Sequence, residues 1–101
     1  MIRKKEDAMR ALSDVPMENH FWVCDGLVLK NLDELLKAAR KMKKDVFNYH
    51  ANEEKNDFSN WVNDIMGDTK LAGDITKSRN KREMAKVLSQ RIKWLKKKTK
   101  K

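Results

Sequence analysis

The sequence predicts a mainly α-helical protein, a compact bundle of four to six short helices that ends in a long basic C-terminal helix. Two observations support this. Apolar residues recur at spacings of three and four, and residues typical of helix caps precede several of these segments. The chain contains only three Gly and one Pro, which excludes low-complexity and collagen-like classes. The length of 101 residues suits one domain. We place this domain at residues 1–95, followed by a basic tail at residues 96–101.

A short helix is expected near the N-terminus, over residues 2–12. Met9 and Leu12 are spaced to share one face of it. Pro16 limits the helix, because a residue that precedes proline is pushed out of the helical region of backbone space.

Two short β-prone runs follow, at residues 21–24 and 27–29, with Asp25 and Gly26 between them. This pattern is typical of a hairpin with a type I′ turn. An all-helical arrangement in which Asp25-Gly26 forms a simple turn is the alternative, and the sequence leaves both open.

The next two helices are indicated by cap residues and apolar stripes. Asn31, followed three residues later by Glu34, resembles a capping box at the start of a helix. Asp45 is expected to cap a shorter helix that ends near His50. The first of these helices carries an apolar stripe formed by Leu32, Leu35, Leu36, Ala39 and Met42.

Two more helices are expected before the last one. Gly67 is placed to end the first of them in the left-handed conformation, and Asp68 to cap the second, which contains Leu71, Ala72 and Ile75. The face of the first that we expect to be buried consists of Phe58, Trp61, Val62, Ile65 and Met66.

The longest helix is expected from residue 80 to residue 98. On a helical wheel its apolar side consists of Met84, Ala85, Val87, Leu88, Ile92 and Leu95. Within about 60° on the opposite side lie Arg82, Lys86, Lys93 and Lys97. Trp94 lies at the border. Arg91 falls inside the apolar side, where its guanidinium either reaches solvent or pairs with an acidic residue of the body.

The positive charge is concentrated in the last quarter of the chain. The chain has 24 Lys and Arg against 15 Asp and Glu, a net charge of +9. Residues 1–76 carry a net charge of −2, and residues 77–101 a net charge of +11. A nearly neutral body with a strongly basic helix favours an interaction with a polyanion.

We therefore expect a small non-enzymatic protein that binds RNA or DNA through the phosphate backbone, of the ribosome- or RNA-associated or the chromatin type. Trp94 is a candidate for stacking on a base. The residues expected to contact phosphates are Arg82, Lys86, Lys93, Lys96, Lys97, Lys98, Lys100 and Lys101, with Arg40, Lys41 and Lys44 as a second patch.

Two other interpretations of the basic helix stay open. It is either a solvated face with no partner, or the docking element of a helical protein–protein interaction module with an acidic partner. A membrane surface fits less well, because a helix that lies in one needs bulkier apolar residues.

The sequence offers little for catalysis or for binding a metal or cofactor. A single cysteine, Cys24, excludes an internal disulfide and a cysteine-based zinc site. No phosphate-binding glycine loop or zinc-protease motif is present. His20 with Cys24 and His50 with Asp57 are the only pairs to consider, and we expect His50 to be a structural imidazole bonded to a nearby carboxylate or cap. We expect no cofactor and no metal.

Residues 21–72 carry a more specific pattern. It includes Phe21, Asp25-Gly26, a helix start at residues 31–35, Tyr49-His50, Asn56-Asp57-Phe58-Ser59, Trp61-Val62, Gly67-Asp68 and Leu71-Ala72. This half of the chain resembles a small helical domain of uncharacterised archaeal and bacterial proteins, a family with no attached activity. The resemblance implies a compact helical module in which His50 and Asp57 form a structural polar pair, with Asp57 capping the helix that opens at Phe58. The basic helix lies outside it.

No apolar run approaches the roughly 20 residues of a membrane span, and no apolar stretch follows the basic N-terminus. We expect a soluble cytoplasmic protein. The sequence does not indicate its oligomeric state.

Overall fold

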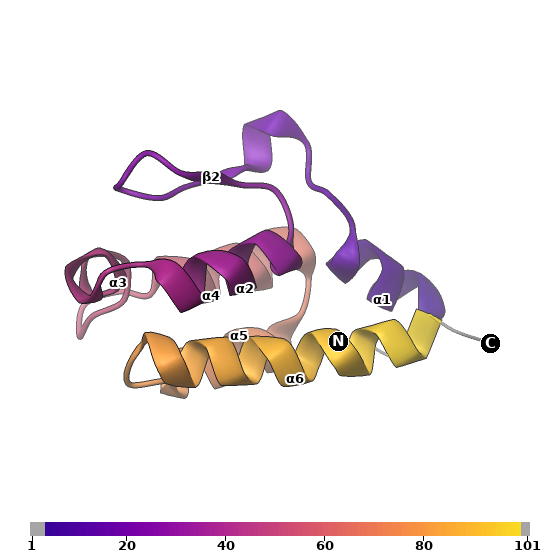
Figure 1. The fold of residues 1–101 in the computed structure, drawn as a ribbon. Helices are drawn as coiled ribbons and strands as arrows, with labels where there is room; N and C mark the ends of the chain where they lie inside the picture. Colours follow the sequence, from indigo (N-terminus) through magenta and orange to yellow (C-terminus); the bar gives the residue numbers. More distant parts are fainter. Residues whose placement is uncertain (1–3, 100–101) are drawn as a thin grey trace.

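The computed structural model describes residues 4–99 and confirms the mainly α-helical fold with a long C-terminal helix. Figure 1 shows the arrangement of its elements. In chain order these are α1 (Lys5–Leu12), the 3-10 turn η1 (Met17–Asn19), β1 (Phe21–Trp22), β2 (Val28–Leu29), α2 (Leu32–Lys41), α3 (Lys44–His50), α4 (Asp57–Trp61), the π-helical segment η2 (Val62–Met66), α5 (Thr69–Lys77) and α6 (Lys81–Thr99).

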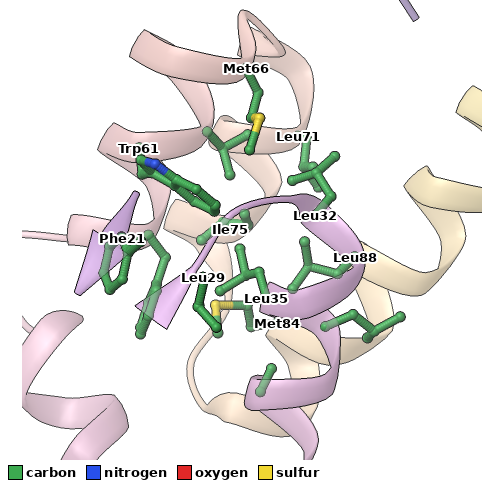
Figure 2. Packing of buried hydrophobic residues seen from close by; sticks show 14 of the residues in the cluster. Phe21, Leu29, Leu32, Leu35, Trp61, Met66, Leu71, Ile75, Met84 and Leu88 are labelled. Atoms are coloured by element: carbon green, nitrogen blue, oxygen red, sulfur yellow. The ribbon is translucent and has the colours of Figure 1, made fainter. Parts of the chain in front are cut away.

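The long helix α6 packs against α1, α2 and α5 (Figure 1). The hairpin of β1 and β2 lies on the side of α2 away from α6 (Figure 1). Between these elements the apolar side chains meet in one cluster, to which α2 contributes Leu32 and Leu35 and α6 contributes Met84 and Leu88 (Figure 2). One core therefore holds the hairpin, the middle helices and α6 together.

The start and the buried stripe of α2 agree with the sequence. The side chain of Asn31 accepts a hydrogen bond from the Glu34 amide at 2.8 Å. The Glu34 carboxylate accepts from the amide of Lys30 instead of that of Asn31, so only half of the capping box forms. All five apolar residues expected to face the core, from Leu32 to Met42, are buried.

The hairpin is present, with antiparallel pairing of Phe21 to Leu29 and of Trp22 to Val28. The expectation of a type I′ turn was wrong. The amide of Val23 donates to the Leu27 carbonyl and the amide of Gly26 to the Val23 carbonyl. Gly26 alone in this loop has a positive φ, of 99°. A type I′ turn needs two central residues with positive φ, whereas a three-residue loop needs only its last residue there.

The buried face of α1 is formed by alanines. Ala8 and Ala11 are completely buried, whereas Met9 is 51% exposed. The reason is tertiary: α1 packs against α6, and small side chains allow two helices to approach closely. Of the two residues expected to share a face, Leu12 packs partly buried against the core and Met9 is mostly exposed.

Two residues predicted as caps lie one or two positions after the observed cap residues. Asp45 lies inside the first turn of α3, which follows Lys43 and has no side-chain cap. A carboxylate in the first turn is still favourable, because it faces the positive end of the helix dipole. The cap of α4 is Asn56, which accepts from the Ser59 amide at 3.0 Å. Asp57 is thus not the cap that the family resemblance implied.

The remaining elements begin and end as expected. The run that starts with α4 continues through η2 to Gly67, which has a φ of 75°. Asp68 then caps α5 by accepting from the Leu71 amide at 3.1 Å. Asn80 precedes α6 and accepts from the Glu83 amide at 2.9 Å.

Candidate functional site

The rotation of α6 about its own axis is set by its apolar side. Met84, Leu88, Ile92 and Leu95 are buried. A helix repeats every 3.6 residues, so the opposite side faces solvent. The four basic residues placed there by the helical wheel, Arg82, Lys86, Lys93 and Lys97, are all exposed.

Arg91 does not reach solvent. Its Nε lies 2.8 Å from Oδ2 of Asp68 and its Nη2 lies 2.9 Å from Oδ1, a bidentate pair. The Asp68 side chain is fully buried and that of Arg91 is 12% exposed. Asp68 also caps α5, so this one carboxylate joins two helices. The charge of Arg91 is therefore used inside the protein, and this residue is not a candidate for contacting a ligand.

Trp94, the predicted stacking residue, is 38% exposed. Its ring centroid lies 4.1 Å from Cζ of Arg91 and 5.1 Å from Nζ of Lys98. Cations at these distances are attracted by the electron-rich face of the indole. The structure thus places Trp94 among the protein's own cations.

Other basic residues near the end of α6 differ in what they contact. Lys96 lies 3.8 Å from Asp33 at the start of α2, with both side chains about half exposed. The helix continues without a break through Lys96, Lys97 and Lys98 to Thr99. Lys100 and Lys101 lie outside the described residues.

The three residues of the predicted second patch, Arg40, Lys41 and Lys44, lie in three different hollows of the surface. Arg40 of α2 joins Arg82 and Lys86 of α6 around a hollow of about 380 Å³ that also includes Ser89 and Gln90. Lys41 lies elsewhere, in a hollow between α2 and the hairpin loop. Only Arg40 therefore extends the basic face of α6 directly.

Lys44 lies in a second hollow, of about 300 Å³, between α3 and the beginning of α6. The other basic side chains that line it are Arg79, Lys81 and Arg82, and no carboxylate lines it. We refer to this hollow and the one beside Arg40 as the basic hollows. They adjoin, because Arg82 lines both. Nζ of Lys81 donates to the Met42 carbonyl, which ties the start of α6 to the end of α2.

Sequence reasoning missed Arg79 and Lys81. Both flank the cap residue Asn80, so neither belongs to the helical face that the wheel singled out. A signal was present: four of the six residues at positions 77–82 are Lys or Arg. Their meeting with Lys44 depends on the placement of α3, which no local pattern indicates.

A larger polar groove adjoins the basic hollows. It has a volume of about 750 Å³ and lies between α3, the loop after it, α4 and the end of α5. Four of its lining residues are Asn48, Asn52, Asn56 and Asn60, and we call it the asparagine groove. Phe47, Asn48 and Arg79 line both this groove and the basic hollow beside α3.

His50 is buried, and both of its ring nitrogens are hydrogen-bonded. Nε2 lies 3.0 Å from the amide of Cys24, which donates to it, and Nδ1 lies 2.9 Å from Oδ2 of Asp57. Because Nε2 accepts, the proton of the neutral ring is on Nδ1 and is donated to Asp57. Neither nitrogen is free to act as a base or to bind a metal. The pair instead joins the hairpin loop to the first turn of α4.

The Asp57 carboxylate also receives a hydrogen bond from Nζ of Lys55 at 3.0 Å. Partial burial of Asp57 opposes its ionisation, but the hydrogen bonds from His50 and Lys55 outweigh this and hold the pKa of the carboxyl below its usual value. The hydrogen bond to Asp57 likewise raises the pKa of Lys55.

Within residues 4–99 no group of three or more His, Cys, Asp or Glu side chains could hold a metal ion. No helix in the same range is long and apolar enough to cross a membrane. Comparison of the chain with family models, curated proteins and solved structures found no match. The resemblance of residues 21–72 to the archaeal and bacterial domain therefore stays a prediction.

Proposed function

We propose that this protein is a non-enzymatic nucleic-acid-binding protein that contacts phosphates through the outer face of α6 and the adjoining basic hollows. One observation carries the proposal. The basic hollows gather six cations, contain no carboxylate in their lining, and use none of those cations in an ion pair among residues 4–99. These six, which we call the hollow cations, are Arg40, Lys44, Arg79, Lys81, Arg82 and Lys86.

The length of the basic face supports a polymeric ligand. From Arg82 to Lys97 the helix rises by about 22 Å, at roughly 1.5 Å per residue. This is the span of about six phosphates along one strand, at roughly 3.4 Å per phosphate. Contacts to phosphates carry no sequence information, so the affinity should be largely independent of sequence.

The first test measures how binding depends on salt. Neutralising about five phosphates of duplex DNA predicts a slope of roughly −4 to −5 for log K against log salt concentration, because each contact releases condensed counterions. Fluorescence anisotropy with labelled 20-nucleotide duplex DNA, single-stranded DNA and single-stranded RNA measures it. A slope near zero, or no binding to any of the three at low salt, contradicts the proposal.

The second test asks whether the charges act at this location. The triple variant Arg40→Gln, Arg82→Gln, Lys86→Gln should reduce the duplex slope by about 2.7, at roughly 0.9 for each lost contact. A matched control removes three charges from other elements: Lys5→Gln, Lys30→Gln, Lys70→Gln. Equal loss in the two variants would show that only net charge matters and would contradict the proposed interface.

An acidic protein is the alternative partner. Polyglutamate of matched charge, used as a competitor, separates the two functions, because it lacks phosphate groups and bases. Tight binding of polyglutamate by the protein, together with weak binding of all three nucleic acids, would favour the protein partner.

A further inference from the structure

The asparagine groove differs in chemistry from the basic hollows that it joins. Its lining combines asparagine amides, hydroxyl groups and the carboxylates of Glu53 and Glu54 with two cations, Lys55 and Arg79. Lys55 is bonded to Asp57, which leaves Arg79 as the cation of the groove without an ion pair among the described residues. Carboxylates repel phosphates, so a phosphate backbone belongs in the basic hollows and not here.

Part of the groove is a fixed frame. Nδ2 of Asn52 donates to the Asn48 carbonyl at 3.0 Å, and its Oδ1 accepts from the Glu54 amide at 3.0 Å. Oγ of Ser59 lies 2.7 Å from Oγ1 of Thr76 and 2.8 Å from the Ala72 carbonyl. The polar groups of Asn52, Ser59 and Thr76 are therefore already hydrogen-bonded within the protein, and these bonds fix the loop after α3, α4 and α5 around the groove.

Two amides of the groove are free to bind a ligand. The side chains of Asn48 on α3 and Asn60 on α4 are exposed and make no hydrogen bond to any residue between 4 and 99. An asparagine amide presents one acceptor and a two-proton donor side by side. This combination matches the donor and acceptor pairs on the edges of nucleobases.

Arg79 lies where the groove meets the basic hollow. Its guanidinium can contact a phosphate or stack on a base. A nucleotide with its phosphate in the hollow would therefore extend its base toward Asn48, which lines both.

We infer that the asparagine groove binds an unpaired base of a single-stranded nucleic acid whose phosphates lie on the hollow cations. The inference rests on the proposed function. A duplex fits the groove poorly, because its bases are stacked and their pairing edges are already occupied. Single strands can turn a base out toward amide groups.

The test uses the double variant Asn48→Ala, Asn60→Ala. Affinity for a single-stranded RNA or DNA 20-mer should fall about tenfold, the size expected for losing well-placed base contacts. Its salt slope should stay unchanged, because no phosphate contact is removed, and duplex affinity should not change. Asn63→Ala, an exposed amide on η2 outside the groove, is the matched control. Circular dichroism checks that each variant is folded.

A strand that contains abasic sites gives a second readout, because it keeps every phosphate and lacks bases. The unmodified protein should bind it about tenfold more weakly than the intact strand, and the double variant should not discriminate between the two. Running RNA and DNA strands in parallel shows which sugar is accepted.

Two results would overturn the inference: single-strand affinity that is the same in the double variant and the unmodified protein, or equal binding of intact and abasic strands by the unmodified protein. Either can occur while the salt slope still supports phosphate binding. Absence of any binding would instead remove the proposed function itself.

Discussion

The two halves of α6 use their basic residues differently, three of which lie in residues 81–90 and five in residues 91–99. In the first half, Arg82 and Lys86 line the basic hollows and have no ion-pair partner among the described residues. In the second half, Arg91 is bound by Asp68, Lys96 lies near Asp33 and Lys98 lies over Trp94. Lys93 and Lys97 in this half face solvent without an ion pair among residues 4–99. The six hollow cations at the other end lie together, so unpaired charge is more concentrated there than at the lysine-rich end of the helix.

This difference separates two roles of positive charge. Charges that the protein itself neutralises contribute to folding, and their removal should change stability. Charges that face hollows without an acid should change binding and leave stability nearly constant. The following predictions test this division, from the largest expected effect to the smallest.

The largest effect is expected at Arg91. Arg91→Met leaves the Asp68 carboxylate fully buried without its partner, which should lower the free energy of unfolding by about 3–5 kcal/mol. Urea denaturation followed by circular dichroism measures it.

The control for this prediction is the double variant Asp68→Asn, Arg91→Met. Asparagine can still cap α5 through its side-chain oxygen, and no charge remains buried. The double variant should recover more than half of the lost stability. A single variant within about 1 kcal/mol of the unmodified protein would show that this ion pair does not anchor α6.

The next effect concerns binding. Arg79→Gln with Arg82→Gln, and Lys97→Gln with Lys98→Gln, remove the same charge from opposite ends of the basic region. The first pair should reduce the duplex salt slope by about 1.8 and the second by about 0.9, because Lys98 lies over Trp94 and only Lys97 belongs to the proposed contact face. Equal reductions would mean that the two ends of α6 contribute alike. Both variants should unfold at nearly the same urea concentration as the unmodified protein.

The Asp57 carboxylate, which is bonded to His50 and Lys55, should make the stability of the protein depend on pH. In the folded protein the pKa of Asp57 lies below its ordinary value of 3.8. The ionised carboxylate therefore contributes stability above about pH 4, and this contribution is lost as the pH falls through the folded pKa. Asp57→Asn can still accept the hydrogen bond from His50 but loses the charge.

The stability difference between the unmodified protein and Asp57→Asn should therefore be largest at pH 5–7 and shrink below the ordinary carboxyl pKa of 3.8. Urea denaturation of both proteins at several pH values measures it, and the other carboxyl groups cancel in the difference. A difference that grows on acidification would contradict the prediction.

The smallest effect is expected at Lys96. Its 3.8 Å approach to Asp33 joins two side chains that are about half exposed, and such surface pairs contribute roughly 0–1 kcal/mol. Lys96→Gln should therefore change the free energy of unfolding by less than about 1 kcal/mol. A larger loss would mean that this pair holds α2 and α6 together.

Much of the fold could be predicted because it depends on local patterns. The stripe of α2, the left-handed Gly67 and the cap Asp68 each follow from residues within one or two helical turns. One error occurred where two neighbours compete for one role. Asn56 and Asp57 can both cap a helix, and the structure uses Asn56 as the cap because Asp57 is bonded to His50.

The candidate site was harder to predict because it depends on contacts between distant segments. The exposed face of α6 follows from the helical period. The ion pair of Arg91 with Asp68 spans 23 residues, and the sequence shows only that Arg91 lies on the apolar side. The hollow shared by Lys44 and Arg79, and the groove shared by Asn48 and Asn60, exist because α3 lies beside the start of α6 and near α4.

The packing of α1 against α6 has a consequence for how the chain folds. The fully buried Ala8 and Ala11 belong to the first helix, and the surface against which α1 packs belongs to the last. Contacts between such distant segments form slowly, because a long loop must close before they can stabilise anything. During synthesis the earlier helices leave the ribosome with their apolar faces uncovered until α6 follows. Apolar surface exposed in this way favours aggregation, so this interval is the one in which aggregation is most favoured.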